Sequence, residues 1–419
     1  MNGPERTRWI LLVLVVLGFA LRLGLGIVLG LNAEPEPSSD SREYDTYAWN
    51  VAQGRGYRGM SPNVADQDHL TAYRPPGISI VWAGLYRVFG HRYDVVRITN
   101  CLAGSATILL VYLIGRRCFN DQVGLLAAAG YAVYPSAIFF SVQLLSEPLG
   151  TFWFLWFVVA CLRFAEHPTC GGGVWAGALL GISILSRPNP VFMIPLVGVW
   201  AIWQFRGQRA AMIKALLIPA AAVAVMIPWW VRNYSVFHSF IPISTMSGSG
   251  LLQGNNRIVA EDPRYMGYNI WDTNIPEYAD ALRSSNDELK RDQMAKGFAI
   301  QWLRDNPDRW LPLARAKLVR AWTPFLQPRT PPIYRWGTLA SWGPVLILFL
   351  IAVIPTLVGF LRSNHPGWII HLAIVNSLII TLMFWGETRY RHSIEPLCII
   401  LASEAFVVGL RALSRCRLG

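Results

Sequence analysis

Stretches of about 20 consecutive apolar residues recur along this chain, and they limit its fold more than any other feature. A helix needs about 20 mostly apolar residues to cross the hydrocarbon core of a bilayer. Ten such segments can be counted, with ends uncertain by several residues: about 9–31, 97–115, 122–142, 149–164, 173–187, 190–205, 211–231, 341–361, 367–386 and 394–412. The sequence therefore predicts an all-α polytopic membrane protein with about ten transmembrane helices.

The composition agrees with a bilayer as the main solvent, because 53% of the 419 residues are hydrophobic and only 15% are charged. A net charge of +12 could indicate a nucleic-acid binder. The arginines, however, are scattered at the ends of the apolar segments and in the loops, without one dense basic tract, so no nucleic-acid partner is expected. None of the six cysteines falls in either long polar stretch, which argues against a disulfide framework or a zinc–cysteine site.

The distribution of basic residues predicts the orientation, since short cytoplasmic loops carry an excess of Lys and Arg. With ten spans, both termini lie in the cytoplasm of a bacterial cell and the protein is a multi-pass protein of the inner membrane. Two long segments then lie outside: residues 32–96, the first outer loop, and residues 232–340, the second outer loop. The stretch 75–90 is too short for a span and is predicted to lie at the interface. The whole chain, 1–419, is interpreted as one domain.

Both outer loops are predicted to contain helices. Tyr44, Tyr47, Ala48 and Val51 follow the i, i+3, i+4, i+7 spacing of a short amphipathic helix, which Gly54 would help to end. In the second outer loop, residues 287–304 and 307–322 read as two helices. We expect this loop to cover the outer surface of the membrane like a lid.

The ionisable and amide residues of the predicted outer face form a specific set: Asp40, Asp45, Arg74, Glu147, Arg187, Arg232, Asn233, Glu387, Arg389 and Arg391. A polyprenyl-phosphate substrate needs cations at the headgroup region to bind its phosphate. An acceptor hydroxyl that attacks a sugar carbon needs a carboxylate base within hydrogen-bond reach. Because a lipid phosphate is already a good leaving group, arginines could stabilise it without a general acid.

Eight short motifs carry a family resemblance. They are DSREYDTYAWNVAQGRGY (40–57), YRPPGISIVWAGLYRVFG (73–90), LLSEPL (144–149), GISILSRPNP (181–190), PWWVRNYSVFHSFIPIST (228–245), LLQGNN (251–256), NPDRWLPLARAKLVRAW (306–322) and ETRYRHSIEP (387–396). At these residues the chain resembles the GT-C glycosyltransferases, and most closely the bacterial family 39 type of protein O-mannosyltransferases and lipid A aminoarabinose transferases. Each motif alone is weak, but their order covers nearly the whole chain.

The resemblance implies that Asp40 is the catalytic base and that Glu147 is the second acidic residue of the catalytic site. It also implies that Arg389 or Arg391 contacts the lipid phosphate. Other interpretations remain open: Asp40 could instead cap the helix that follows it, and Glu147 could favour the start of the next helix. Asp45 is interpreted as part of a solvated helix face.

The remaining candidates for substrate binding are Arg74, Arg187, Arg232, Asn233 and Glu387. For Arg187 and Arg232, the alternative is that each side chain merely extends from a helix end to the interface.

The chain departs from the family at Tyr73-Arg74-Pro75-Pro76, where relatives often carry an acidic and a basic residue before the proline. This departure weakens the case for a bound metal. His69, His238 and His392 lack the spacing of a zinc site. No cofactor is firmly predicted, although a divalent cation held by Asp40 and Glu147 remains an option.

The leading hypothesis is an inverting transferase that moves a monosaccharide from a polyprenyl-phosphate donor to a hydroxyl of a cell-envelope lipid, polysaccharide or protein. A second hypothesis is a transporter or flippase of lipid-linked sugar, but transporters tend to bind at the bilayer midplane. A third is a ligase or polymerase of lipid-linked glycans. The sequence identifies neither the sugar nor the acceptor.

Overall fold

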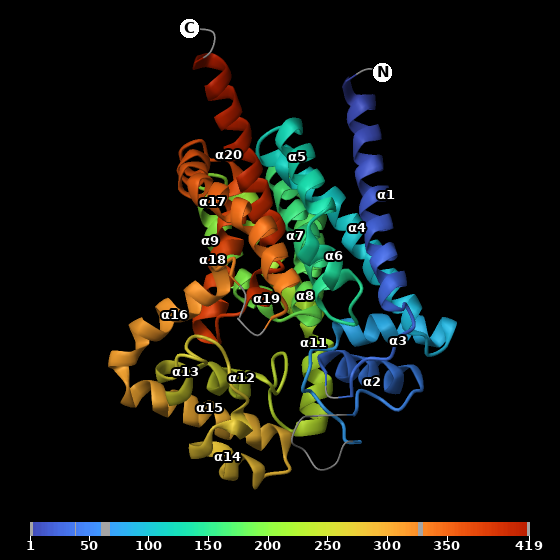
Figure 1. The fold of residues 1–419 in the computed structure, drawn as a ribbon, viewed down its shortest axis with the longest axis vertical. Helices are drawn as coiled ribbons and strands as arrows, with labels where there is room; N and C mark the ends of the chain where they lie inside the picture. Colours follow the sequence, from blue (N-terminus) through green and yellow to red (C-terminus); the bar gives the residue numbers. More distant parts are fainter. Residues whose placement is uncertain (1–2, 38, 60–67, 326–329, 417–419) are drawn as a thin grey trace.

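The computed structural model describes residues 3–37, 39–59, 68–325 and 330–416. Within these ranges the chain forms α-helices and short 3-10 helices, without a β-strand. The described ends of the first and last helices lie at one end of a helical bundle, and the two outer loops gather at the opposite end (Figure 1). An even number of crossings requires this arrangement, so it agrees with the predicted topology.

Within the described part of the chain, seven helical segments are long and apolar enough to span a membrane. They are α1 (Gly3–Leu29), α4 (Tyr93–Cys118), α7 (Glu147–Glu166), α10 with α11 (Arg209–Ala215 and Leu217–Phe237), α17 (Pro332–Arg362), α18 (Ile369–Met383) with the short helix η4 (Pro366–Trp368) before it, and α20 (Glu395–Cys416). An eighth candidate is the pair α5 (Asp121–Ala132) and α6 (Pro135–Ser141), bent by 55°. Two predicted spans are shorter apolar helices: α8 (Cys170–Ser186), and α9 (Met193–Gln204) together with η1 (Asn189–Phe192). All ten predicted segments are thus helical, and the membrane-protein fold class is confirmed.

The bend between α5 and α6 has a local cause at Pro135. Proline lacks a backbone N–H and clashes with the preceding turn, so it ends α5 and begins a new helix at its own position. Elsewhere in the bundle, glycines allow close packing: a Cβ on Gly177 of α8 would clash with the carbonyl oxygen of Ile218 in α11. Such small residues let membrane helices approach closely.

The first outer loop contains the predicted amphipathic helix as α2 (Asp40–Ala52), and the stretch predicted to lie at the interface as α3 (Gly77–Phe89). Gly54 follows α2 with a φ of 72°, in the left-handed region that favours glycine. The two helices pack through Tyr44 and Trp82, which are both buried. A Cβ on Gly77 would lie 2.8 Å from the backbone of Leu185, so α3 begins directly against the end of α8.

Asp45 is buried, which contradicts the prediction that it lies on a solvated face. Its carboxylate accepts hydrogen bonds from the Tyr86 hydroxyl at 2.7 Å and pairs with the Nε2 atom of His91 at 2.8 Å. The His91 ring stacks on Trp49, with 4.5 Å between the ring centroids. Asp45 therefore joins α2 to the end of α3, a contact that the local helical pattern of α2 could not reveal.

The second outer loop forms a layer of helices at the same end of the bundle as α2 and α3 (Figure 1). The two predicted helices are α15 (Glu288–Asp305) and α16 (Trp310–Trp322), with a short 3-10 turn between them. Three further helices were not predicted: α12 (Ser247–Gly254), α13 (Arg257–Glu261) and α14 (Pro276–Arg283). α12 packs along α15, and Leu252, Ala295 and Ala299 are buried between them.

Candidate active site

Asp40 is the first residue of α2, and its side chain leaves the helix toward the bundle. The helix is capped by Ser39, whose hydroxyl accepts from the backbone N–H of Arg42 at 3.3 Å. The alternative that Asp40 itself caps the helix is therefore wrong. Since Ser39 fulfils that role, the Asp40 carboxylate is available for other contacts.

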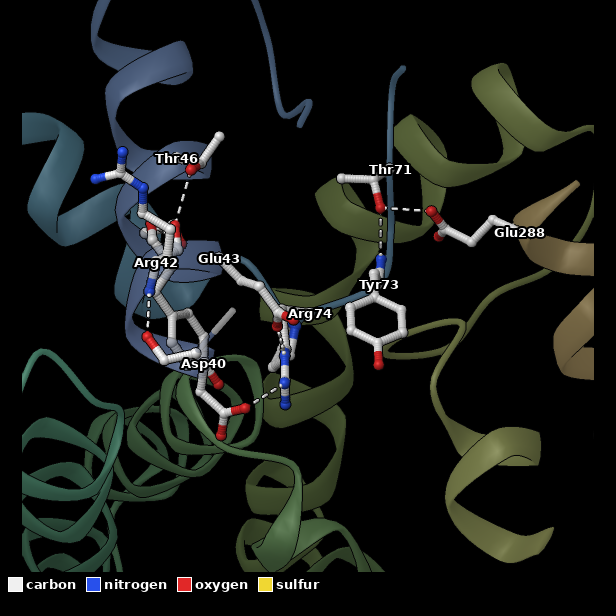
Figure 2. A network of polar contacts seen from close by, with 12 residues as sticks. Asp40, Arg42, Glu43, Thr46, Thr71, Tyr73, Arg74 and Glu288 are labelled. Atoms are coloured by element: carbon white, nitrogen blue, oxygen red, sulfur yellow. Dashed lines mark hydrogen bonds and ion pairs between the residues drawn. The ribbon is translucent and has the colours of Figure 1, made fainter. Parts of the chain in front are cut away.

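Asp40 is held by two guanidinium groups. Its Oδ1 atom lies 2.8 Å from Arg74, in the segment before α3, and its Oδ2 atom lies 2.7 Å from Arg389, in the short helix α19 (Thr388–Arg391). Arg74 also binds Glu43 at 2.6 Å. Figure 2 shows the Asp40 and Glu43 side chains both pointing toward the Arg74 side chain.

The same chain of charges continues into the bundle through Glu147, the first residue of α7. Glu147 is completely buried. Its Oε1 atom binds the guanidinium of Arg389, and Arg187, directly after α8, lies 2.8 Å from the same oxygen. Arg187 also donates to the Ser146 hydroxyl and to the backbone carbonyl of Arg389.

Six residues thus form a row of alternating charge, which we call the charged row: Glu43, Arg74, Asp40, Arg389, Glu147 and Arg187. They come from five separate parts of the chain. Three carboxylates face three guanidinium groups, so the row is balanced internally.

This arrangement sets the protonation states of the groups that lie outside the spans. Burial alone would raise the pKa of Asp40, but Arg74 and Arg389 outweigh it and hold the pKa below its ordinary value. Burial instead dominates at Glu43, whose pKa is raised. Burial would lower the pKa of Arg389, yet Glu147 and Asp40 raise it well above its usual range. Asp40 is therefore ionised at neutral pH, and Arg389 stays charged.

A cavity of about 460 Å³ opens beside the charged row. Asp40, Arg74, Arg187 and Arg389 line it, and so does Glu387, which directly precedes α19. The remaining walls come from the first outer loop, η1, the end of α18 with the turn and α19 after it, and the second outer loop. Their lining residues include Tyr73, Asn189, Val191, Phe192, Ser244, Ser247, Gln253, Asn269, Trp271, Ile380, Met383, Trp385 and Tyr390. The cavity therefore has one charged side and a larger side of apolar and neutral polar residues.

Glu288, at the start of α15, joins the two outer loops. Its carboxylate accepts from the Thr71 hydroxyl at 2.6 Å and from the Ala72 backbone N–H at 3.0 Å, and the Thr245 hydroxyl also donates to it. Figure 2 shows Glu288 reaching Thr71 just before Tyr73 and Arg74. Burial would raise the pKa of Glu288, but hydrogen bonds, of which that from His69 is the largest, lower it. The ionised carboxylate thereby fixes the segment that carries Arg74.

Four of the nine candidate catalytic and substrate-binding residues lie outside the cavity lining: Glu147, Arg232, Asn233 and Arg391. Arg232 donates to the backbone carbonyls of Thr71 and Tyr57 at 2.8 Å each, and Asn233 is buried beside it. Arg391 binds Glu395 and the carbonyl of Ala321. Arg232, Asn233 and Arg391 hold the backbone around the site, whereas Asp40, Arg74, Arg187, Glu387 and Arg389 line the cavity. Glu147 is buried behind this lining and binds Arg187 and Arg389.

Arg389 lies between Asp40 and Glu147 and binds both carboxylates. Its guanidinium group therefore takes the place that a divalent cation held by these two residues would have. Within the described residues, no group of three or more His, Cys, Asp or Glu side chains is arranged to hold a metal ion.

Several residues of the site were not singled out from the sequence. Gln253 lies in the LLQGNN motif, which contributed to the family resemblance but did not indicate that the Gln253 side chain lines the site. Tyr73 and Trp385 also line the cavity, and each lies within two residues of a predicted site residue. Their closeness in sequence to Arg74 and Glu387 was the only feature that could have indicated their role. Asn269 and Trp271 lie in an irregular segment of the second outer loop, where no periodic pattern indicates which side chains face inward.

Comparison with solved structures shows which class of protein has this fold. The oligosaccharyltransferase of Archaeoglobus fulgidus tethered to an acceptor peptide is similar over 99% of this chain and 51% of its own, with a TM-score of 0.60 and 15% identity. The same enzyme with an inhibitory peptide and a dolichol-phosphate is similar over 98% of this chain and 51% of its own, with a TM-score of 0.57 and 14% identity. The chain therefore has the fold of the GT-C membrane glycosyltransferases, as the resemblance predicted.

Sequence comparisons agree with this class. The family model for dolichyl-phosphate-mannose-protein mannosyltransferase matches residues 73–231. An undecaprenyl phosphate-α-4-amino-4-deoxy-L-arabinose arabinosyl transferase of Pseudomonas fluorescens is 28% identical over 160 residues, which are 35% of this chain and 28% of that protein. The chain thus spans about half the length of the oligosaccharyltransferase and matches less than a third of the arabinosyl transferase.

Proposed function

We propose that this protein is a membrane glycosyltransferase that moves a monosaccharide from a polyprenyl-phosphate donor to a hydroxyl acceptor. The observation that carries the proposal is the cavity of about 460 Å³, which combines the charged row with an apolar side in a GT-C fold. Such a cavity offers guanidinium groups for a phosphate, a carboxylate base for a hydroxyl and an apolar surface for an isoprenoid.

The donor phosphate is expected to bind Arg74 and Arg389, which both line the cavity. Arginine binds phosphate through parallel hydrogen bonds of the same geometry that it uses for carboxylates. Since both guanidinium groups contact Asp40, an incoming phosphate would compete with that carboxylate for them. Donor binding would thereby release an oxygen of Asp40 to face the acceptor.

In the proposed reaction, Asp40 accepts the proton of the acceptor hydroxyl as the hydroxyl oxygen attacks the anomeric carbon of the sugar. The bond between that carbon and the phosphate oxygen breaks, and the polyprenyl phosphate leaves with the electron pair. Attack from the face opposite the phosphate inverts the configuration at the anomeric carbon. Because the low pKa of Asp40 makes it a weak base, much of the rate would come from positioning and electrostatic stabilisation.

The isoprenoid part of the donor fits the apolar side of the cavity, where Val191, Phe192, Ile380 and Met383 lie. These residues belong to η1 and α18, which are part of the bundle, so an isoprenoid could reach them from the bilayer. In this proposal the site faces away from the cytoplasm of a bacterial inner membrane, and the described ends of α1 and α20 lie at the other, cytoplasmic end of the bundle (Figure 1).

The transfer of a lipid-linked oligosaccharide is a second candidate, because the fold match is to an oligosaccharyltransferase. A flippase is less favoured, because the charged row lies at one end of the bundle and not at its middle. Incubation of purified protein with a panel of polyprenyl-phosphate monosaccharides and a cell-envelope acceptor fraction tests the proposal. A labelled product is expected; consumption of only a diphosphate-linked oligosaccharide, or movement of lipid-linked sugar across proteoliposomes without transfer, would contradict it.

A further inference from the structure

The wall that the second outer loop gives to the cavity is uncharged. Of the side chains between residues 242 and 271, none that lines the cavity is ionisable. Its polar members are Ser244, Ser247, Gln253 and Asn269, and Trp271 adds an indole that is 44% exposed. Hydroxyl and carboxamide groups can donate and accept hydrogen bonds, and a flat aromatic ring offers an apolar face.

Acidic residues do lie behind this wall, but they are used by the fold. Asp292 accepts from the backbone N–H groups of Gly248 and Ser249 at 2.6 and 3.2 Å, at the start of α12. Asp272 accepts from the Ser249 hydroxyl at 2.7 Å and from the Thr273 N–H at 2.8 Å. Both carboxylates are buried, so neither is available to a ligand in the cavity.

This acidic layer also orients the polar wall. The Ser249 hydroxyl, which donates to Asp272, accepts from the Nε2 atom of Gln253 at 3.0 Å. The amide nitrogen of Gln253 is thereby engaged within the protein, and among the described residues no side chain or backbone group donates a hydrogen bond to its Oε1 atom. A sugar hydroxyl is a suitable donor for this oxygen.

We propose that the sugar carried by the donor is uncharged, with hydroxyls that bind Gln253, Asn269 and the serines and with a C–H face that packs on Trp271. This inference rests on the proposed transferase function and specifies its substrate class. An ammonium or carboxylate group placed against this wall would lose its hydration without gaining an opposite charge, which is unfavourable.

Among the described residues, two carboxylates line the cavity, those of Asp40 and Glu387. Because Asp40 is bound by Arg74 and Arg389, Glu387 is the one that an amino sugar would use instead. Its Oε2 atom accepts from the indole N–H of Trp385 at 3.0 Å, and its charge contributes to the raised pKa of Arg389. Glu387 therefore belongs electrostatically to the turn that holds the phosphate-binding arginine. This turn also contacts the second outer loop, since the Gly386 N–H donates to the Gly267 carbonyl at 2.7 Å, so the variant Glu387→Gln is needed to isolate the contribution of its carboxylate.

Competition binding distinguishes these possibilities. Purified full-length protein in nanodiscs would be loaded with radiolabelled undecaprenyl phosphate, which would then be displaced by unlabelled undecaprenyl phosphate linked to glucose, mannose, glucuronic acid or 4-amino-4-deoxyarabinose. With a neutral sugar attached, the concentration needed to displace half of the label should be about tenfold lower than for undecaprenyl phosphate alone, because one aromatic contact and one hydrogen bond together stabilise the complex by about that factor. The two charged sugars are expected to give no improvement.

Variants connect this preference to the wall. Trp271→Ala should remove the gain from the neutral sugar while undecaprenyl phosphate still binds, and Gln253→Glu should shift the preference toward the amino sugar. Gln208→Glu, an exposed residue outside the cavity lining, provides the same chemical change as a control.

Two failures are separable. If the amino sugar binds most tightly in the wild-type protein and Glu387→Gln removes that preference, or if either charged sugar binds as well as the neutral ones, the uncharged-sugar proposal is overturned. If undecaprenyl phosphate itself does not bind, the proposed transferase function fails.

Discussion

Glu147 is the most deeply buried carboxylate of the charged row, and its removal should have a large and specific cost. Glu147→Gln keeps the shape of the side chain but leaves Arg187 without a carboxylate within ion-pair distance among the described residues. Removing one partner of a buried ion pair costs about 3–5 kcal/mol, because the other charge stays buried without compensation. We expect Glu147→Gln to lower the free energy of unfolding by about that amount.

The assay is equilibrium unfolding by SDS in mixed micelles, followed by tryptophan fluorescence. Glu166→Gln is the matched control, because Glu166 pairs with Arg117 but is 46% exposed; an exposed pair contributes less than about 1 kcal/mol. Adding Arg187→Met to Glu147→Gln removes the unpaired charge and should recover part of the stability. The reasoning is refuted if Glu147→Gln and Glu166→Gln lower the free energy of unfolding equally. It is also refuted if the double variant loses as much stability as Glu147→Gln and Arg187→Met lose in sum when each is made alone.

Three further predictions concern other parts of the site. Glu288→Gln should loosen the contact between the outer loops and increase hydrogen exchange of residues 68–72; unchanged exchange would count against this link. Burial lowers the pKa of Lys317 to about 7, so the folded chain binds fewer protons there than the unfolded chain above that pH. Stability should therefore rise from pH 7 to 9, and Lys317→Met should weaken this rise if Lys317 is its source. Because Arg389 binds both Asp40 and Glu147, chelation with EDTA should leave turnover unchanged; a loss restored by Mg²⁺ or Mn²⁺ would contradict this prediction.

Long apolar segments made the bundle predictable, because their length and composition depend little on distant parts of the chain. The helices α2, α15 and α16 were also predictable, since each combines a start signal with helical spacing. The short helices α12, α13 and α14 were missed because five to eight residues hold at most about two helical turns, too few to establish a period.

The errors at individual residues have a common physical cause. Asp45 looked solvated because its partners Tyr86 and His91 lie more than 40 residues away in the sequence. Arg232 was a candidate for substrate binding because it follows a helical segment at the outer face, but the packing of the outer loops directs its side chain toward the backbone carbonyls of Thr71 and Tyr57.

The most direct test of the central claim compares transfer by Asp40→Asn with transfer by Asp45→Asn. Both variants remove a carboxylate from α2 and keep its shape, but only Asp40 lines the cavity. With a donor and acceptor on which the wild-type protein is active, Asp40→Asn should lower kcat by about 10²–10⁴-fold, the usual contribution of a general base. Asp45→Asn, confirmed as folded, should retain most of the activity. Wild-type turnover by folded Asp40→Asn would contradict the assignment of the site.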